Sequence, residues 1–92
     1  MEVSFLDKDK EAEFDYDDDC VKFWAIVDRE ACQCFIEGFA LQLFGDAGVK
    51  ATLETFEANK DAIHRIARTL LEGGRGSDGR LYISYEDVLR LR

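Results

Sequence analysis

The sequence predicts an α+β domain in which a small antiparallel sheet carries helices on one face. Short runs rich in β-branched and aromatic residues predict strands near both ends of the chain. Between them, a long segment repeats apolar residues at helical spacing, which predicts one long amphipathic helix beside a shorter one. The elements follow the order β-β-β-α-α-β, and the 92 residues suit a single domain spanning residues 1–92.

Three strands are expected before the first helix. The first lies within residues 1–6, the second is CVKFWAIVD at 20–28, and the third is ACQCFIE at 31–37, which returns as the antiparallel partner of the second. Arg29–Glu30 lacks the Asn-Gly pair of a tight primed turn, so a four-residue loop is expected between the second and third strands.

The segment DKDKEAEFDYDDD, residues 7–19, is polar and acidic and contains two aromatic residues, Phe14 and Tyr16. Such a run of charge is typical of a solvated loop. We expect the two rings to pin this acidic loop to the body of the domain.

Helical segments are expected next. FALQLF at 39–44 predicts a short helical run, and residues 49–74 predict the long helix. The apolar residues of the long helix share one arc of a helical wheel: Val49, Leu53, Phe56, Ile63, Ile66, Ala67, Leu70 and Leu71. RLYIS at 80–84 predicts the last strand, and residues 87–92 predict a final helical turn.

The formal net charge of −8 is unevenly placed along the chain. Residues 1–46 carry 13 acids against 4 bases, whereas residues 47–92 carry 7 acids against 8 bases. Phosphate backbones repel an acidic chain, which disfavours general nucleic-acid binding, although the second half could form a local basic patch. The arginines available for such a patch are Arg65, Arg68, Arg75, Arg80, Arg90 and Arg92.

The composition also bears on location. The start of the chain has no apolar run of signal-peptide length, and no window approaches the roughly 18 apolar residues of a membrane span. The three cysteines fit a reducing compartment better than a disulfide framework. We therefore expect a cytoplasmic protein with no membrane partner.

A resemblance that covers nearly the whole chain is carried by five stretches, VKFWAIVD, CQCFI, LQLFG, TLETFEANKDAIHRIA and GRLYISYED. Together they resemble a family of short bacterial proteins known only as a domain of unknown function. The pattern F-x-x-N-[KR]-x-x-I-x-x-[IA]-A in the long helix is the most distinctive part. The resemblance implies a small α+β domain, and it offers no activity, ligand or functional residue. The hairpin turn departs from the family, because Arg29–Glu30 stands where a glycine is expected.

The cysteines and the single histidine raise the question of a zinc site, whose ligands would be Cys20, Cys32, Cys34 and His64. The hairpin register that pairs Val27 with Cys32 gives one wholly apolar face. In that register Cys20 points away from Cys32 and Cys34, so three thiolates cannot converge on one ion. Cys32 and Cys34 stand at i and i+2 of one strand, too far apart for a relaxed disulfide. We expect them to fill the core and expect no metal site.

Three other stretches lack the residue pattern that a calcium site, a catalytic site or a phosphate-binding loop requires. DYDDD at 15–19 alternates acids as an EF-hand loop does, but Cys20 and Ile26 occupy the positions that need Gly and Glu. His64 lies at the border of the apolar arc, and the sequence places no nucleophile beside it. GGRGSDG at 73–79 follows a helix, whereas a phosphate-binding loop precedes one. We expect no catalytic residue and no cofactor, and hence no enzyme.

The other face of the hairpin holds the surface of most interest. The favoured register places Trp24 directly across from Phe35, and with Ile26 these residues form an aromatic patch on the side that helices would leave open. Such patches mark protein contacts, in which Trp is especially frequent. The alternative is that the N-terminal segment folds across the patch and buries it through Phe14 or Tyr16.

Two functional hypotheses follow. The first is a non-enzymatic cytoplasmic interaction or regulatory module, which contacts a protein partner or a second copy of itself through Trp24, Ile26 and Phe35. The second is a nucleic-acid-associated regulator, which uses Arg65, Arg68, Arg90 and Arg92.

Overall fold

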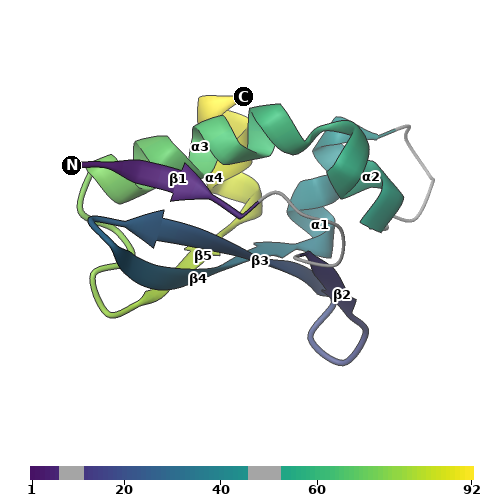
Figure 1. Cartoon of the computed structure of the whole chain (residues 1–92). Coiled ribbons are helices and arrows are strands. Elements are labelled where there is room, and N and C mark those ends of the chain that lie inside the picture. The colour runs from purple at the N-terminus through teal and green to yellow at the C-terminus, as the bar shows by residue number, and fades with distance from the viewer. Residues whose placement is uncertain (7–11, 46–52) are drawn as a thin grey trace.

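The computed structural model describes residues 1–6, 12–45 and 53–92, and it confirms the α+β class. A five-stranded sheet forms one layer and the helices lie together on one of its faces (Figure 1). The strands are β1 (Val3–Phe5), β2 (Glu13–Asp15), β3 (Cys20–Val27), β4 (Glu30–Glu37) and β5 (Arg80–Ile83). The helices are α1 (Gly38–Leu41), the 3-10 helix η1 (Gln42–Phe44), α2 (Leu53–Ala58), α3 (Lys60–Glu72) and α4 (Tyr85–Leu91).

The sheet is mixed rather than antiparallel throughout. Its strand order is β1-β3-β4-β5, and β2 also pairs with β3. The strands β1, β2 and β4 run antiparallel to β3, but β5 joins β4 in parallel, with Cys34 opposite Leu81. Parallel neighbours need a long crossover connection. The chain makes that crossover through the helices between β4 and β5.

The acidic segment 7–19 contains a strand where a loop is expected. Its first part, residues 7–11, lies outside the described residues, but β2 pairs with the start of β3. Alternation explains this short strand: Phe14 points to the helix side and packs against the core, whereas Glu13 and Asp15 point to the opposite face.

The hairpin of β3 and β4 differs from the expected register by two residues. Trp24 lies opposite Gln33, and Phe35 lies opposite Lys22, so the predicted Trp24–Phe35 pair is wrong. The cause is the turn at 28–29, which contains two residues instead of four. Both residues have positive φ, 49° and 74°, as in the primed turns that suit a twisted hairpin. A shift of two residues keeps every side chain on its expected face.

Arg29 is the residue that this turn accommodates least well. Its φ of 74° costs a residue with a Cβ atom about 1 kcal/mol, whereas glycine adopts it freely. We expect Arg29→Gly to raise the free energy of unfolding by about 0.5–1 kcal/mol, measured by urea denaturation. Arg29→Ala is the matched control, because it removes the same side chain but keeps the Cβ atom. An equal gain from Arg29→Ala would show that backbone strain is not the cause.

The predicted long helix is divided at Asn59 into α2 and α3. Asn59 has φ −124° and ψ 19°, and its Nδ2 donates to the carbonyl of Thr55 at 2.9 Å. Asparagine side chains compete for backbone groups in this way, which explains a break inside a continuous apolar pattern. The expected start of the helix at Val49 lies outside the described residues.

The shorter helices lie close to their predicted positions. The run at 39–44 is divided between α1 and η1, and the final helical turn begins two residues earlier than expected, at Tyr85. Ser84 explains that start, because its side chain and that of Asp87 form a reciprocal capping box. No helix in the described ranges is long and apolar enough to span a bilayer.

The core lies between the helices and the inner face of the sheet. Phe23 of β3 and Phe56 of α2 are each 1% exposed, and their ring centroids are 5.2 Å apart. His64 of α3 joins them, since its ring stacks on Phe5 at 4.1 Å and lies 5.6 Å from Phe23. The histidine at the border of the apolar arc is therefore a member of an aromatic cluster.

Candidate functional site

One face of the sheet carries no helix within the described residues, and we call it the open face (Figure 1). Strand alternation places on it the side chains that point away from the helices. The members that matter below are Cys20, Lys22, Trp24, Ile26, Gln33, Phe35, Glu37, Arg80 and Tyr82.

Trp24, Ile26 and Phe35, the residues of the predicted patch, lie on the open face and are half-buried. Phe35 stacks on Tyr82 of β5, with ring centroids 4.8 Å apart and an angle of 12° between the rings. Tyr82 is 57% exposed, which makes it the most accessible aromatic side chain of this face. The sequence interpretation missed Tyr82, although the alternation in RLYI puts it on one face together with Arg80.

Neither ring of the acidic segment covers this patch. Phe14 packs against the core on the helix side, and Tyr16 is 82% exposed. The two rings contact each other instead, with centroids 4.8 Å apart. The expected burial of the patch beneath these rings is therefore not found in the described residues.

A hollow of about 580 Å³ lies on the open face over β3, β4 and β5. Its lining combines the stacked aromatic pair with a thiol, an amide and charged groups of both signs: Cys20, Lys22, Gln33, Phe35, Arg80 and Tyr82, together with Asp18 and Glu37. The hollow therefore offers a stacked aromatic pair and charged groups of both signs to a ligand or to an anchoring side chain.

Lys22 is paired within this hollow. Its Nζ lies 2.7 Å from Oδ2 of Asp15 and 5.9 Å from the centroid of the Phe35 ring. The hydrogen bond between the two charged groups raises the pKa of Lys22 and lowers the pKa of Asp15. Oδ1 of Asp15 also accepts the backbone N–H groups of Asp17 and Asp18, at 3.0 and 3.2 Å. Asp15 thus stabilises the turn between β2 and β3 through these two hydrogen bonds.

The structure separates the three cysteines as strand parity predicts. Cys32 and Cys34 face the core and are 3% and 0% exposed, whereas Cys20 lines the hollow and is 6% exposed. Burial raises the pKa of each thiol, which is the opposite of what a reactive cysteine requires. Among the residues described, no three Cys, His, Asp or Glu side chains form a group that could hold a metal ion.

The four arginines of the nucleic-acid hypothesis are largely engaged within the chain. Arg68 and Arg92 each donate to a backbone carbonyl, at 3.1 and 3.0 Å. Arg90 lies 3.5 Å from a carboxylate of its own helix, and Arg65 is exposed on α3. These contacts compete with phosphate groups for three of the four side chains.

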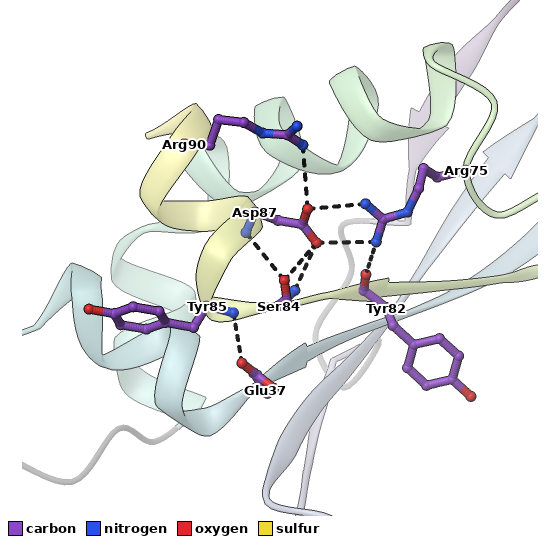
Figure 2. A network of polar contacts seen from close by, with 7 residues as sticks. All are labelled: Glu37, Arg75, Tyr82, Ser84, Tyr85, Asp87 and Arg90. Carbon is purple, nitrogen blue, oxygen red and sulfur yellow. Dashed lines mark hydrogen bonds and ion pairs between the residues drawn. The ribbon is translucent and has the colours of Figure 1, made fainter.

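A polar network links β5 to α4 beside the hollow (Figure 2). Its centre is Asp87, which is 7% exposed; Arg75 donates to both of its carboxylate oxygens, at 3.0 and 3.1 Å. Ser84 donates to the same carboxylate through its backbone N–H and its hydroxyl, both at 3.0 Å. Burial raises the pKa of Asp87, but these hydrogen bonds outweigh it and hold the pKa below its ordinary value. Nearby, Glu37 accepts the N–H of Tyr85 at 2.7 Å.

Arginines also cap both outer strands of the sheet. Nη2 of Arg75 donates to the carbonyl of Tyr82 on β5 at 2.7 Å, and Nη2 of Arg68 donates to the carbonyl of Val3 on β1 at 3.1 Å (Figure 2 shows the first). Exposed backbone groups on edge strands invite pairing with another chain. These two contacts leave fewer backbone groups of β1 and β5 open to such pairing.

These features define the class of the protein as a small α+β domain whose mixed sheet, in the described part of the chain, carries helices on one face. The chain belongs to the family described as "Protein of unknown function (DUF1488)", which matches residues 3–83. The helix α4, with Asp87, lies beyond the matched residues.

A solved structure confirms the fold. The chain is similar to a protein of unknown function from the DUF1488 family of Shewanella loihica PV-4, with a TM-score of 0.69 and 20% sequence identity. The similarity covers 88% of this chain and 90% of that chain. No curated protein matches the chain. The comparisons therefore establish the family and its small α+β fold, and they assign no activity.

Proposed function

We propose that this protein is a non-enzymatic module that acts through protein contact, and that the open face is its contact surface. The observation that carries the proposal is the open face, which presents Trp24 and Ile26 on β3 and the stacked pair of Phe35 and Tyr82 on β4 and β5. Accessible apolar surface on a small domain is common at interaction sites, and aromatic side chains dominate the binding energy of such sites.

Two further features support face-on contact. The hollow beside the Phe35–Tyr82 pair offers space for an anchoring side chain of a partner. The arginine caps on β1 and β5 oppose pairing through the edges. The alternative, a regulator that binds nucleic acid through arginines, is less favoured because Arg68, Arg90 and Arg92 have partners within the chain.

Site-specific photo-crosslinking in the native cell tests this proposal. Tyr82→p-benzoylphenylalanine places a photoreactive ring on the open face, and Phe39→p-benzoylphenylalanine is the matched control on α1, because Phe39 is 60% exposed. We expect a discrete adduct from position 82 that disappears when Trp24→Ala is added, and no such adduct from position 39. The adduct mass distinguishes a second copy of the chain from another protein. Equal adducts from both positions, or none from position 82, would contradict the proposal.

A further inference from the structure

The acidic excess of this chain lies almost entirely in the strands and turns that form and border the open face. Residues 12–37, which contain β2, β3 and β4, carry eight acids and two bases. Residues 53–92, which contain α2, α3, β5 and α4, carry seven acids and seven bases. The segment that contains β2, β3 and β4 is therefore negative, whereas the segment that contains most of the helices and β5 is neutral.

Several of these acids are placed where a bound partner would meet them. Asp18 and Glu37 line the hollow, at the end of the sheet where β3 begins and β4 ends. Asp17 and Asp19 are exposed in the turn that leads into β3. Lys22 offsets them little, because Asp15 already pairs with it at 2.7 Å. Arg80, the other cation of the hollow, lies opposite Gln33 at the start of β5, away from this end of the sheet. The aromatic surface thus has a negative border at this end.

We infer that the open face binds a basic segment of another protein, in which an apolar anchor stands close to an arginine or lysine. This inference rests on the proposed function of the open face and names the kind of partner. The anchor would lie against the Phe35–Tyr82 pair, and the cation would meet Asp18 and Glu37. A guanidinium group suits both surfaces, since it pairs with carboxylates and also stacks on exposed rings such as Tyr82.

Electrostatics favours this occupant over two others. A two-fold dimer joins the same patch of both copies, so both surfaces of such a contact would carry the same excess of acids. A nucleic acid would bring phosphates against the same acids. A basic segment is the occupant whose charge complements this border.

A random-peptide display library, selected against the full chain, tests the inference without knowledge of the natural partner. We expect the selected peptides to be basic and to contain an aromatic or large aliphatic residue. For a synthetic copy of the leading peptide, the Kd should rise about tenfold on the combined change Asp17→Asn, Asp18→Asn and Glu37→Gln. The Kd should also rise as the salt concentration increases from about 0.05 M to about 0.5 M. The matched control neutralises three exposed acids of the helical layer, with the changes Glu54→Gln, Asp61→Asn and Glu72→Gln, and should leave the Kd within about twofold.

The outcomes separate the inference from the proposed function. Selection of neutral or acidic peptides, or an equal Kd for the two neutralised variants, would overturn the inference. The proposed function would survive that result if Tyr82→Ala or Trp24→Ala still weakened binding. Both the inference and the proposed function would be overturned if the selection gave no peptide. The same holds if neither Tyr82→Ala nor Trp24→Ala raised the Kd of the selected peptide. A free chain that sediments as a dimer and becomes monomeric on Tyr82→Ala would overturn the inference in favour of a second copy.

Discussion

Phe23→Ala is expected to lower the free energy of unfolding by about 3–5 kcal/mol, the cost of deleting a fully buried phenylalanine. Phe23 is 1% exposed and packs between β1 and the helices, with ring centroids 6.2 Å from Phe5, 5.2 Å from Phe56 and 5.6 Å from His64. The cavity would adjoin all three rings, so the surroundings could not collapse without moving two layers. Because small domains are stable by only about 5–15 kcal/mol, this loss is a large part of the total.

Urea denaturation checks the size of this effect. Phe39→Ala is the matched control, because it makes the same chemical change at a side chain that is 60% exposed and contacts one ring, that of Tyr85. We expect the control to cost about 1 kcal/mol or less. A larger loss for Phe39 than for Phe23 would contradict the packing described above.

Asp87→Asn is expected to lower the free energy of unfolding at about pH 7 by about 2 kcal/mol. The change keeps the shape of the side chain, but it removes the charge that Arg75 meets at 3.0 and 3.1 Å and turns an N–H₂ group toward existing donors. The loss should stay below the roughly 3–5 kcal/mol of a fully buried ion pair, because the side chain of Arg75 is 45% exposed.

The same network predicts a pH dependence. The pKa of Asp87 is lower in the folded chain than its ordinary value of 3.8, so the carboxylate contributes fully above that pH. Its contribution is lost as the pH falls through the pKa of the folded state. The difference in stability between the unchanged chain and Asp87→Asn should therefore be widest near neutral pH and should narrow as the pH falls below the ordinary pKa of 3.8.

Glu86→Gln provides the control for both measurements. Glu86 is an exposed acid in the same first turn of α4, so its neutralisation perturbs the helix dipole equally without touching the network. We expect a change of about 0.5 kcal/mol or less. A difference for Asp87→Asn that persists undiminished at low pH would show that packing, rather than charge, explains its effect.

The sequence predicted the class of fold and the faces of the central hairpin. The alternation in CVKFWAIV and EACQCFIE divides apolar from mixed residues so clearly that a shift by one residue would place Lys22 in the core. A shift by two residues preserves that division, and this is the size of the error in the predicted register. The face occupied by Trp24, Ile26 and Phe35 could therefore be predicted, while their neighbours across the strands could not.

The elements that the sequence did not predict depend on local exceptions or on distant contacts. The turn at 28–29 places Arg29 in a conformation that favours glycine, which no propensity suggests. Asn59 interrupts a helix whose apolar pattern continues past it, through a hydrogen bond of its own side chain. The strand β2 contains only three residues within an acidic run.

Only part of the candidate site could be predicted from the sequence, because the rest depends on contacts between distant segments. Its β3 and β4 residues follow from alternation within one hairpin. The place of Tyr82 beside Phe35 depends on the parallel pairing of β5 with β4, which joins residues on either side of α1, η1, α2 and α3. A pairing so remote in the sequence leaves no signal in either strand alone.

The arginine caps of β1 and β5 have a consequence for how many chains could join one another. Pairing of the β1 edge of one chain with the β5 edge of another is a head-to-tail contact that does not close on itself, so each added chain would present a fresh edge and growth would continue as a filament. Arg68 and Arg75 occupy carbonyls at the two ends of the sheet where such growth would start. Contact across a face ends with a single partner. The two side chains thus favour a complex of defined size over open-ended polymerisation.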